Sequence, residues 1–143
     1  TRCARVTGVQ TCALPISTKD IHVIRDATRG GVGTVLYEIA GQSHVGIHLD
    51  SQAIPVDPAV RGVCGMLGLE PLYLACEGRL VIFAPKAVAG DIVATLRQGK
   101  YSKDAAIIGE VTADQPGRVI MRTEIGAETL LPPPGGELLP RIC

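Results

Sequence analysis

The sequence of 143 residues has few aromatic residues and no excess of either charge. It contains three tyrosines, one phenylalanine and no tryptophan, and its 14 lysines and arginines are balanced by 14 aspartates and glutamates. Proteins that bind nucleic acid generally combine a basic surface with aromatic rings on which bases stack. No nucleic-acid partner is therefore expected.

Long apolar runs are also absent. Charged residues or glycines interrupt every hydrophobic stretch well before the roughly 18 residues that a membrane-spanning helix needs. No basic start is followed by an apolar segment of the kind found in signal peptides. We therefore expect no membrane association and no secretion, and a location in the cytoplasm.

The first 17 residues need separate treatment. The stretch 6–16 reads VTGVQTCALPI, which resembles the translation of a sequencing adapter, and a natural but disordered extension is the alternative. Without these residues, 12 basic residues face 14 acidic ones, and the cysteines are reduced to Cys64, Cys76 and Cys143. This odd number without a CxxC spacing supports neither a disulfide framework nor a zinc site. Residues 1–17 are therefore left out of the predicted fold.

Hydrophobic periodicity predicts a single α+β domain over residues 18–134. Apolar residues recur at helical spacing in 32–42, 58–67 and 86–97, with Gly41 expected to end the first helix and Pro58 to begin the second. Short β-branched or alternating runs predict strands at 21–25, 45–50, 72–76, 79–85, 105–112 and 117–123. Because only two residues separate 72–76 from 79–85, these runs are expected to form an antiparallel hairpin. The predicted fold is a mixed β-sheet with helices packed on it.

A glycine-rich motif, DATRGG, joins the first of these strands to the first helix. Glycine allows a ligand to approach the backbone, a helix N-terminus attracts anions, and an arginine can hold a phosphate. The motif therefore predicts a phosphate or nucleotide site made by Asp26, Thr28, Arg29, Gly30 and Gly31. The alternative is a tight turn in which Asp26 or Thr28 only satisfies nearby backbone amides.

Glu77 lies in the two-residue turn of the predicted hairpin. A carboxylate held there by two strands can act as a general base if it faces a cleft, whereas most turn glutamates are only solvated. The three histidines have no metal-ligand spacing on one helical face, so no metal site is expected within this chain.

Residues 135–143 form a predicted flexible tail that ends on Cys143. Gly135 and Gly136 provide a hinge, and from Gly136 the tail can reach about 23 to 25 Å when extended. An exposed terminal thiol could be a reactive group that swings between sites, or an accident of truncation.

Several segments together resemble one family, the HypE hydrogenase expression/formation proteins. These segments are RDATRGG, EIA, SHVGIHLD, AIPV, EGRLVIFAP, DAAIIGEV and the terminal LPRIC, and they span residues 21–143. The terminal PRIC separates this family from its relatives, the aminoimidazole ribonucleotide synthetases and selenophosphate synthetases. The resemblance implies the C-terminal domain of a two-domain protein, with the fold of the C-terminal domain of aminoimidazole ribonucleotide synthetase.

The resemblance also implies an activity. Proteins of this family accept a carbamoyl group on the terminal cysteine from the carbamoyltransferase HypF, dehydrate it to a thiocyanate with ATP, and pass the cyano group to a HypC–HypD complex for nickel–iron hydrogenase. By this resemblance Cys143 is the carrier, DATRGG faces the phosphates and Glu77 is the base. ATP and Mg²⁺ are the implied cofactors, bound mainly by an N-terminal domain that this chain lacks, and a homodimer is implied for the full-length protein. The chain is expected to be inactive alone.

At two positions the sequence departs from the family pattern. Cys76 and Tyr37 stand where the family usually has asparagine. A competing interpretation is a non-catalytic carrier domain that only presents its tail to maturation partners.

Overall fold

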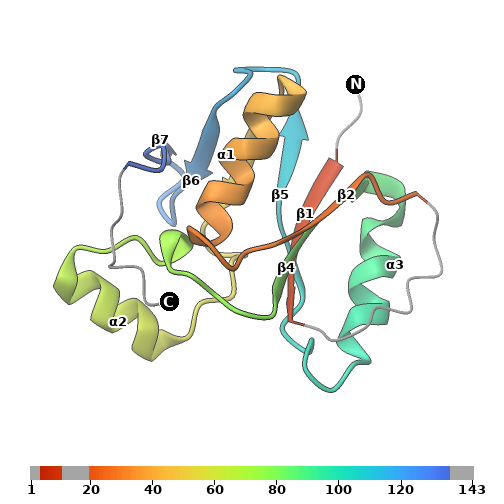
Figure 1. The fold of residues 1–143 in the computed structure, drawn as a ribbon, viewed down its shortest axis with the longest axis horizontal. Helices are drawn as coiled ribbons and strands as arrows, with labels where there is room; N and C mark the ends of the chain where they lie inside the picture. Colours follow the sequence, from red (N-terminus) through yellow and green to blue (C-terminus); the bar gives the residue numbers. More distant parts are fainter. Residues whose placement is uncertain (1–3, 11–19, 136–143) are drawn as a thin grey trace.

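The structure, a computed structural model, describes the backbone of residues 4–10 and all of residues 20–135. Its centre is a sheet of seven strands in the order β2-β4-β1-β5-β3-β6-β7 (Figure 1). The strands are β1 (Ala4–Gln10), β2 (Val23–Asp26), β3 (Gly46–Asp50), β4 (Arg79–Pro85), β5 (Ala106–Thr112), β6 (Val119–Arg122) and β7 (Glu128–Leu130). The helices are α1 (Gly31–Ser43), α2 (Pro58–Leu67), α3 (Lys86–Arg97) and the short 3-10 helix η1 (Pro71–Tyr73).

The sheet is mixed, which confirms the predicted fold class. Strands β3 and β6 are parallel, and the other neighbouring pairs are antiparallel. The three predicted helices are confirmed, and α2 has the predicted bounds, with Pro58 as its first residue. Gly41 does not end α1, because the helix continues to Ser43 and closes on His44, whose backbone is left-handed and whose N–H bonds to the carbonyl of Ala40.

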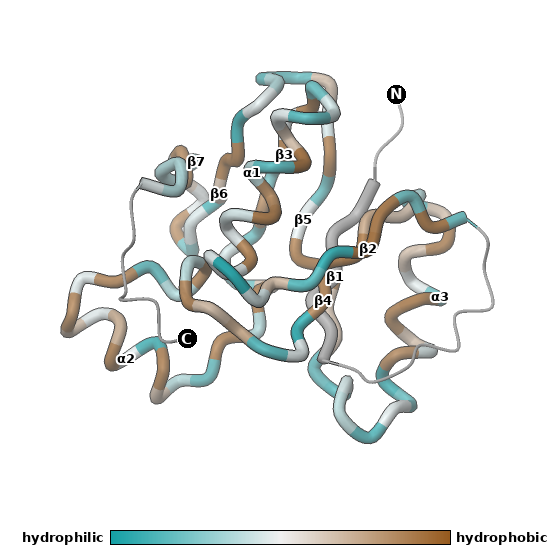
Figure 2. The backbone as a smooth tube through the Cα atoms, in the orientation of Figure 1, coloured by the Kyte–Doolittle hydropathy of each residue, from teal (hydrophilic) through white to brown (hydrophobic). Residues whose placement is uncertain are grey.

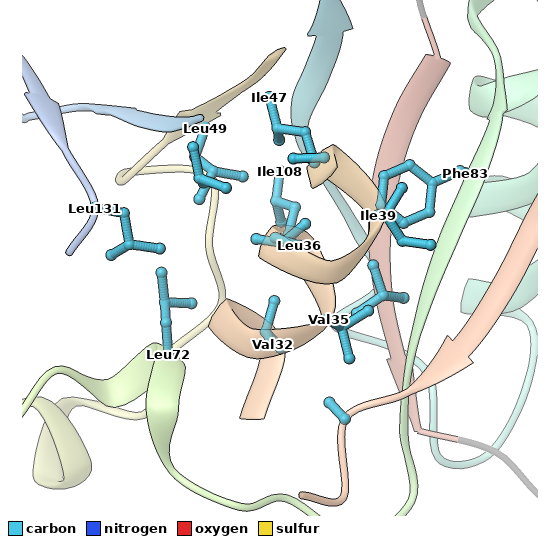
Figure 3. Close-up of a cluster of buried hydrophobic side chains, with 14 of the residues drawn as sticks. Val32, Val35, Leu36, Ile39, Ile47, Leu49, Leu72, Phe83, Ile108 and Leu131 are labelled. Atoms are coloured by element: carbon cyan, nitrogen blue, oxygen red, sulfur yellow. The ribbon is translucent and has the colours of Figure 1, made fainter. Parts of the chain in front are cut away.

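Helices cover both faces of the sheet, so the core consists of two clusters, one on each face. On β4, Val81 and Phe83 face the cluster under α1, whereas Ile82 and Ala84 face the cluster under α3, because successive side chains of a strand point to opposite faces. Hydrophobic and polar residues alternate along α1 and α3 accordingly (Figure 2). Leu36 of α1 is fully buried in the larger cluster (Figure 3).

The predicted hairpin around Glu77 is wrong. Only its second half is a strand, β4, and the neighbours of β4 are β2 and β1. The first half begins as η1, where Pro71 occupies the first helical position and the Glu70 carboxylate accepts a bond from the Leu72 N–H at 3.3 Å. The apolar side chain of Leu72 is buried beneath α1, although the residue lies in a 3-10 turn and not in a strand.

Three further findings correct or extend the predicted sheet. Residues 4–10, which the sequence analysis left out of the fold, form β1 and lie between β4 and β5. The adapter origin of residues 1–17 stays a prediction. Strand β7 was not predicted, because all three of its residues are exposed and give no alternating pattern. In the sheet order, which the sequence did not predict, β3 lies between β5 and β6.

Candidate active site

The DATRGG motif lies where β2 ends and α1 begins. Asp26 is the last residue of β2, and Gly30 and Gly31 have φ values of 68° and 65°, a left-handed conformation that favours glycine. A Cβ on Gly31 would lie 2.6 Å from the carbonyl oxygen of Leu74, so the backbone after η1 presses directly on the start of α1. The second glycine of the motif is therefore required by packing as well as by its φ.

The first turn of α1 has backbone amides that no side chain caps. Gly30 is the N-cap residue and has no side chain. Within the described residues, no side chain accepts a capping hydrogen bond from the amides of this turn. The Thr28 hydroxyl donates instead to Oδ2 of Asp26 at 2.8 Å. Neither Asp26 nor Thr28 accepts a backbone amide bond among residues 20–135, so the turn-only alternative lacks the bonds on which it depended. Open amides at a helix N-terminus can bind an anion.

Arg29 is exposed beside these amides. Its side chain makes no hydrogen bond and no ion pair within the described part of the chain. By contrast, the nearby Arg25 is held by Glu38 of α1 at 2.6 Å. The guanidinium of Arg29 is therefore available to a ligand at the start of α1.

Glu77 lies close to the motif, although not at a hairpin tip. The loop that carries it is bonded to Ala27 on both sides, because the Ala27 N–H donates to the Arg79 carbonyl at 2.9 Å and its carbonyl accepts from the Cys76 N–H at 3.2 Å. Glu77 itself is exposed, and its carboxylate has no partner in the described residues. Two backbone bonds to one motif residue thus bring Glu77 and DATRGG together.

Cys76, next to Glu77, is a half-buried free thiol. Cys64 is also free and is the buried residue of α2. Cys143 lies outside the described residues.

Two tyrosines that the sequence analysis did not place in the site hold the segment that leads to the tail. The hydroxyl of Tyr37, from α1, donates to the carbonyl of Leu131, and the hydroxyl of Tyr73, from η1, donates to the carbonyl of Pro132. Burial raises the pKa of Tyr73 to about 12 and also raises the pKa of Tyr37. Both hydroxyls therefore stay protonated at neutral pH and act as donors.

The start of the tail is close to the first turn of α1. A Cβ on Gly33 would lie 2.5 Å from Cε1 of Tyr73, so the tyrosine ring lies directly against the backbone of that turn. The same ring carries the hydroxyl that binds Pro132. No periodic pattern could have indicated Tyr73, and its only signal was the scarcity of aromatic residues in the sequence.

Within residues 20–135, no group of three or more histidine, cysteine, aspartate or glutamate side chains could hold a metal ion. His48 pairs only loosely with Glu128, with 3.9 Å between Nδ1 and Oε1. Among the helices that the structure describes, none is both long and apolar enough to cross a membrane.

Comparison with known proteins gives a consistent result. The family model of the AIR synthase related protein, C-terminal domain, matches residues 4–122. The carbamoyl dehydratase HypE of Bradyrhizobium diazoefficiens is 45% identical over 125 residues, which are 87% of this chain and 36% of that protein. The chain therefore spans about a third of the length of the curated relatives that it matches.

Solved structures agree with this match. A crystal structure of the hydrogenase maturation protein HypE in complex with ATP has a TM-score of 0.78 and 47% identity, covering 87% of this chain and 38% of that chain. The structure of a HypE–HypF complex has a TM-score of 0.82 and 28% identity, covering 94% of this chain and 54% of that chain.

Proposed function

Since the chain belongs to the family of C-terminal domains of AIR synthase related proteins, and matches HypE proteins over most of its length, we propose that it is the C-terminal domain of a carbamoyl dehydratase of hydrogenase maturation. The full-length protein uses ATP to convert a carbamoyl group on Cys143 into a thiocyanate, in the cytoplasm. The cyano group then becomes a cyanide ligand of nickel–iron hydrogenase. The domain alone is inactive, because the remaining nucleotide-binding groups belong to the N-terminal domain.

The reaction removes the oxygen of a thiocarboxamide. ATP transfers its terminal phosphoryl group to the carbamoyl oxygen and leaves as ADP, which turns that oxygen into a leaving group. The C–O bond then breaks as phosphate departs, and the amide nitrogen loses two protons in total as the C≡N bond forms. A base must accept these protons, and Glu77 has this role in the proposal.

The site residues divide this work between them. The backbone amides of Gly30 and Gly31, which no side chain caps, and the guanidinium of Arg29 bind phosphate oxygens, because each supplies N–H donors at the positive end of α1. Asp26 and Thr28 support the turn that presents these donors.

The group of oxygen ligands needed for Mg²⁺ is incomplete in the described residues. Asp26 offers one carboxylate in the motif, and one of its oxygens already accepts the Thr28 hydroxyl. Mg²⁺ is commonly held by one or two carboxylates together with phosphate oxygens. Asp26 could supply one ligand, with the nucleotide and the N-terminal domain supplying the others.

One observation carries the proposal, namely the position of Pro132. Its carbonyl is bonded to Tyr73, whose ring lies against the first turn of α1. The tail that ends in Cys143 therefore starts beside the amides and the arginine proposed to bind ATP. A tether from this point can bring a group on Cys143 to the phosphates.

The proposed partners follow from the same reaction. A HypF-type carbamoyltransferase supplies the carbamoyl group, and a relative has been solved as a HypE–HypF complex. The HypC–HypD complex accepts the cyano group, and the full-length protein acts as a homodimer. Delivery to two partners requires a group that can leave its own site, as a terminal thiol can.

Deletion of Cys143 tests the carrier role. In a full-length protein carrying this domain, incubation with transferase, carbamoyl phosphate and ATP should add a carbamoyl group that intact-mass analysis detects. The deletion should abolish this adduct, while Cys64→Ala and Cys76→Ser should keep it, because burial holds Cys64 unreactive. An adduct that persists after the deletion contradicts the proposal.

Glu77→Gln separates catalysis from the simple carrier alternative. The substitution keeps the shape of the side chain and removes its basicity, so carbamoylated protein should accumulate while cyanation slows by about 10² or more. Glu124→Gln, at another exposed glutamate, is the matched control and should convert normally. Normal conversion in Glu77→Gln would exclude Glu77 as the base.

A further inference from the structure

Two tyrosine hydroxyls from separate elements bind consecutive carbonyls at the point where the chain leaves the sheet. Tyr37 lies on α1 and binds Leu131, and Tyr73 lies on η1 and binds Pro132. They are separated from their acceptors by 94 and 59 residues, so the arrangement exists only in the folded domain. Two donors on adjacent peptide groups hold this segment more specifically than a single contact would.

The residue between these carbonyls and the sheet is itself immobilised. Leu131 is fully buried and lies next to Leu72 of η1 in the larger core cluster (Figure 3). Its N–H donates to the carbonyl of Val119 at 2.9 Å. The burial and the backbone bond of Leu131 thus fix the place where the chain leaves the sheet. The bond to the carbonyl of Pro132 then also fixes the direction in which the chain continues.

Direction matters here because the next residues are stiff. Pro132, Pro133 and Pro134 follow without interruption and are all exposed. A run of prolines is extended and semi-rigid, at about 3.1 Å per residue, so these three form an arm about 9 Å long. An orientation fixed at Pro132 is therefore carried to Gly135.

We propose that Tyr37 and Tyr73 form a clamp that sets the direction of the proline arm, residues 132–134, at its base beside the first turn of α1. Both tyrosines are positioning residues rather than catalytic residues. The use of the tail as a carrier rests on the proposed function, whereas the clamp itself is a property of the described residues.

The two tyrosines contribute unequally. Tyr73 binds the carbonyl of Pro132, the first residue of the arm, and its ring lies against Gly33 beside the anion site. Tyr37 binds the carbonyl of Leu131, which burial and the bond to Val119 already hold. Loss of the Tyr73 hydroxyl should therefore release the arm more than loss of the Tyr37 hydroxyl.

The test measures where the end of the arm lies. Spin labels are placed on Gly135→Cys at the end of the arm and on Gln42→Cys on the exposed side of α1, in the 143-residue chain with its native cysteines replaced by serine or alanine. Pulsed electron paramagnetic resonance then gives the distribution of distances between the labels. A second pair, on Gln42→Cys and Gln98→Cys, reports the fold of the domain without the arm.

The clamp predicts a narrow distribution for the arm pair with the native tyrosines. Tyr73→Phe should widen it by several ångströms, as expected for an arm about 9 Å long that pivots at its base. Tyr37→Phe should widen it less, and the double variant at least as much as Tyr73→Phe. Tyr101→Phe is the matched control, since Tyr101 is exposed and its ring lies under the ammonium group of Lys100, and it should change nothing.

Two results would overturn the clamp: a broad distribution with native tyrosines, or an unchanged width in the double variant. A change in the Gln42–Gln98 pair would show that the variants act through the fold, and this too would count against a positioning role. Failure of the proposed function would appear differently, as an uncarbamoylated Cys143 in the full-length protein with its native cysteines, while the distance distribution of the spin-labelled chain stays narrow and tyrosine-dependent.

Discussion

Replacing Gly31 with alanine should destabilise the domain by about 2 to 5 kcal/mol. The φ of Gly31 is +65°, and a residue with a Cβ adopts this conformation at a cost of roughly 1–2 kcal/mol. The new methyl group would also meet the carbonyl oxygens of Leu72 and Leu74, the latter at 2.6 Å. These are backbone atoms that cannot rotate away, and overpacking of this kind adds about 1–3 kcal/mol.

Gly41→Ala is the matched control in the same helix. Apart from its two chain neighbours and the backbone of its own helix, no atom of the described residues lies within 4 Å of the position that a Cβ would take on Gly41, and the residue is exposed. Alanine is favoured over glycine in a helix by roughly 0.5–1 kcal/mol, so this variant should be slightly more stable than the native chain. The two glycine-to-alanine changes are therefore expected to have opposite signs.

The free energy of unfolding is measured by urea denaturation, followed by far-ultraviolet circular dichroism. The reasoning is refuted if Gly31→Ala unfolds within about 0.5 kcal/mol of the native chain, the range typical of neutral surface changes. It is equally refuted if both variants are destabilised by the same amount, because the difference between them rests on the positive φ of Gly31 and on its contact with the carbonyls of Leu72 and Leu74.

Three further predictions concern single side chains. The pKa of Tyr73 is raised to about 12, so the stability that its protonated hydroxyl contributes should be complete below pH 10 and lost as the pH rises to about 12. The ultraviolet titration of tyrosinate should show one late-ionising group, and Tyr73→Phe should remove it. Arg29→Ala should weaken ATP binding to a full-length protein carrying this domain by about 1.5–3 kcal/mol in calorimetry, whereas Arg61→Ala should leave it unchanged. Asp57→Ala removes the carboxylate oxygen that accepts the Ala59 N–H at 2.8 Å at the start of α2. The midpoint of urea unfolding should fall by an amount equivalent to about 1 kcal/mol, and an unchanged midpoint would count against the cap.

Local signals were sufficient to predict the helices. Both ends of α2 are marked in the sequence, by Asp57 and Pro58 at its start and by Gly68, whose φ of +68° closes it. Such marks act within one turn of helix and do not depend on the rest of the chain. The mixed sheet likewise followed from the order of strand-like and helix-like segments.

The errors arose where tertiary contacts decide the structure. The apolar run 72–76 fits a strand by composition, yet Pro71 and the Glu70 carboxylate begin a 3-10 turn that buries Leu72 under α1. Proximity between Glu77 and DATRGG was expected only through the family resemblance, and in the structure it depends on the two backbone bonds of Ala27. The two tyrosines bind acceptors far along the chain, for which no local pattern exists.

The place of β1 in the sheet has a consequence for how the domain is completed. Residues 4–10 are bonded on one side to β4 and on the other to β5, so without them the sheet would divide into two pieces with open edges. Open edges attract any extended strand, because backbone bonds do not depend on sequence. A peptide of suitable length, added separately, should therefore be able to enter the same slot and restore a domain that lacks its first segment.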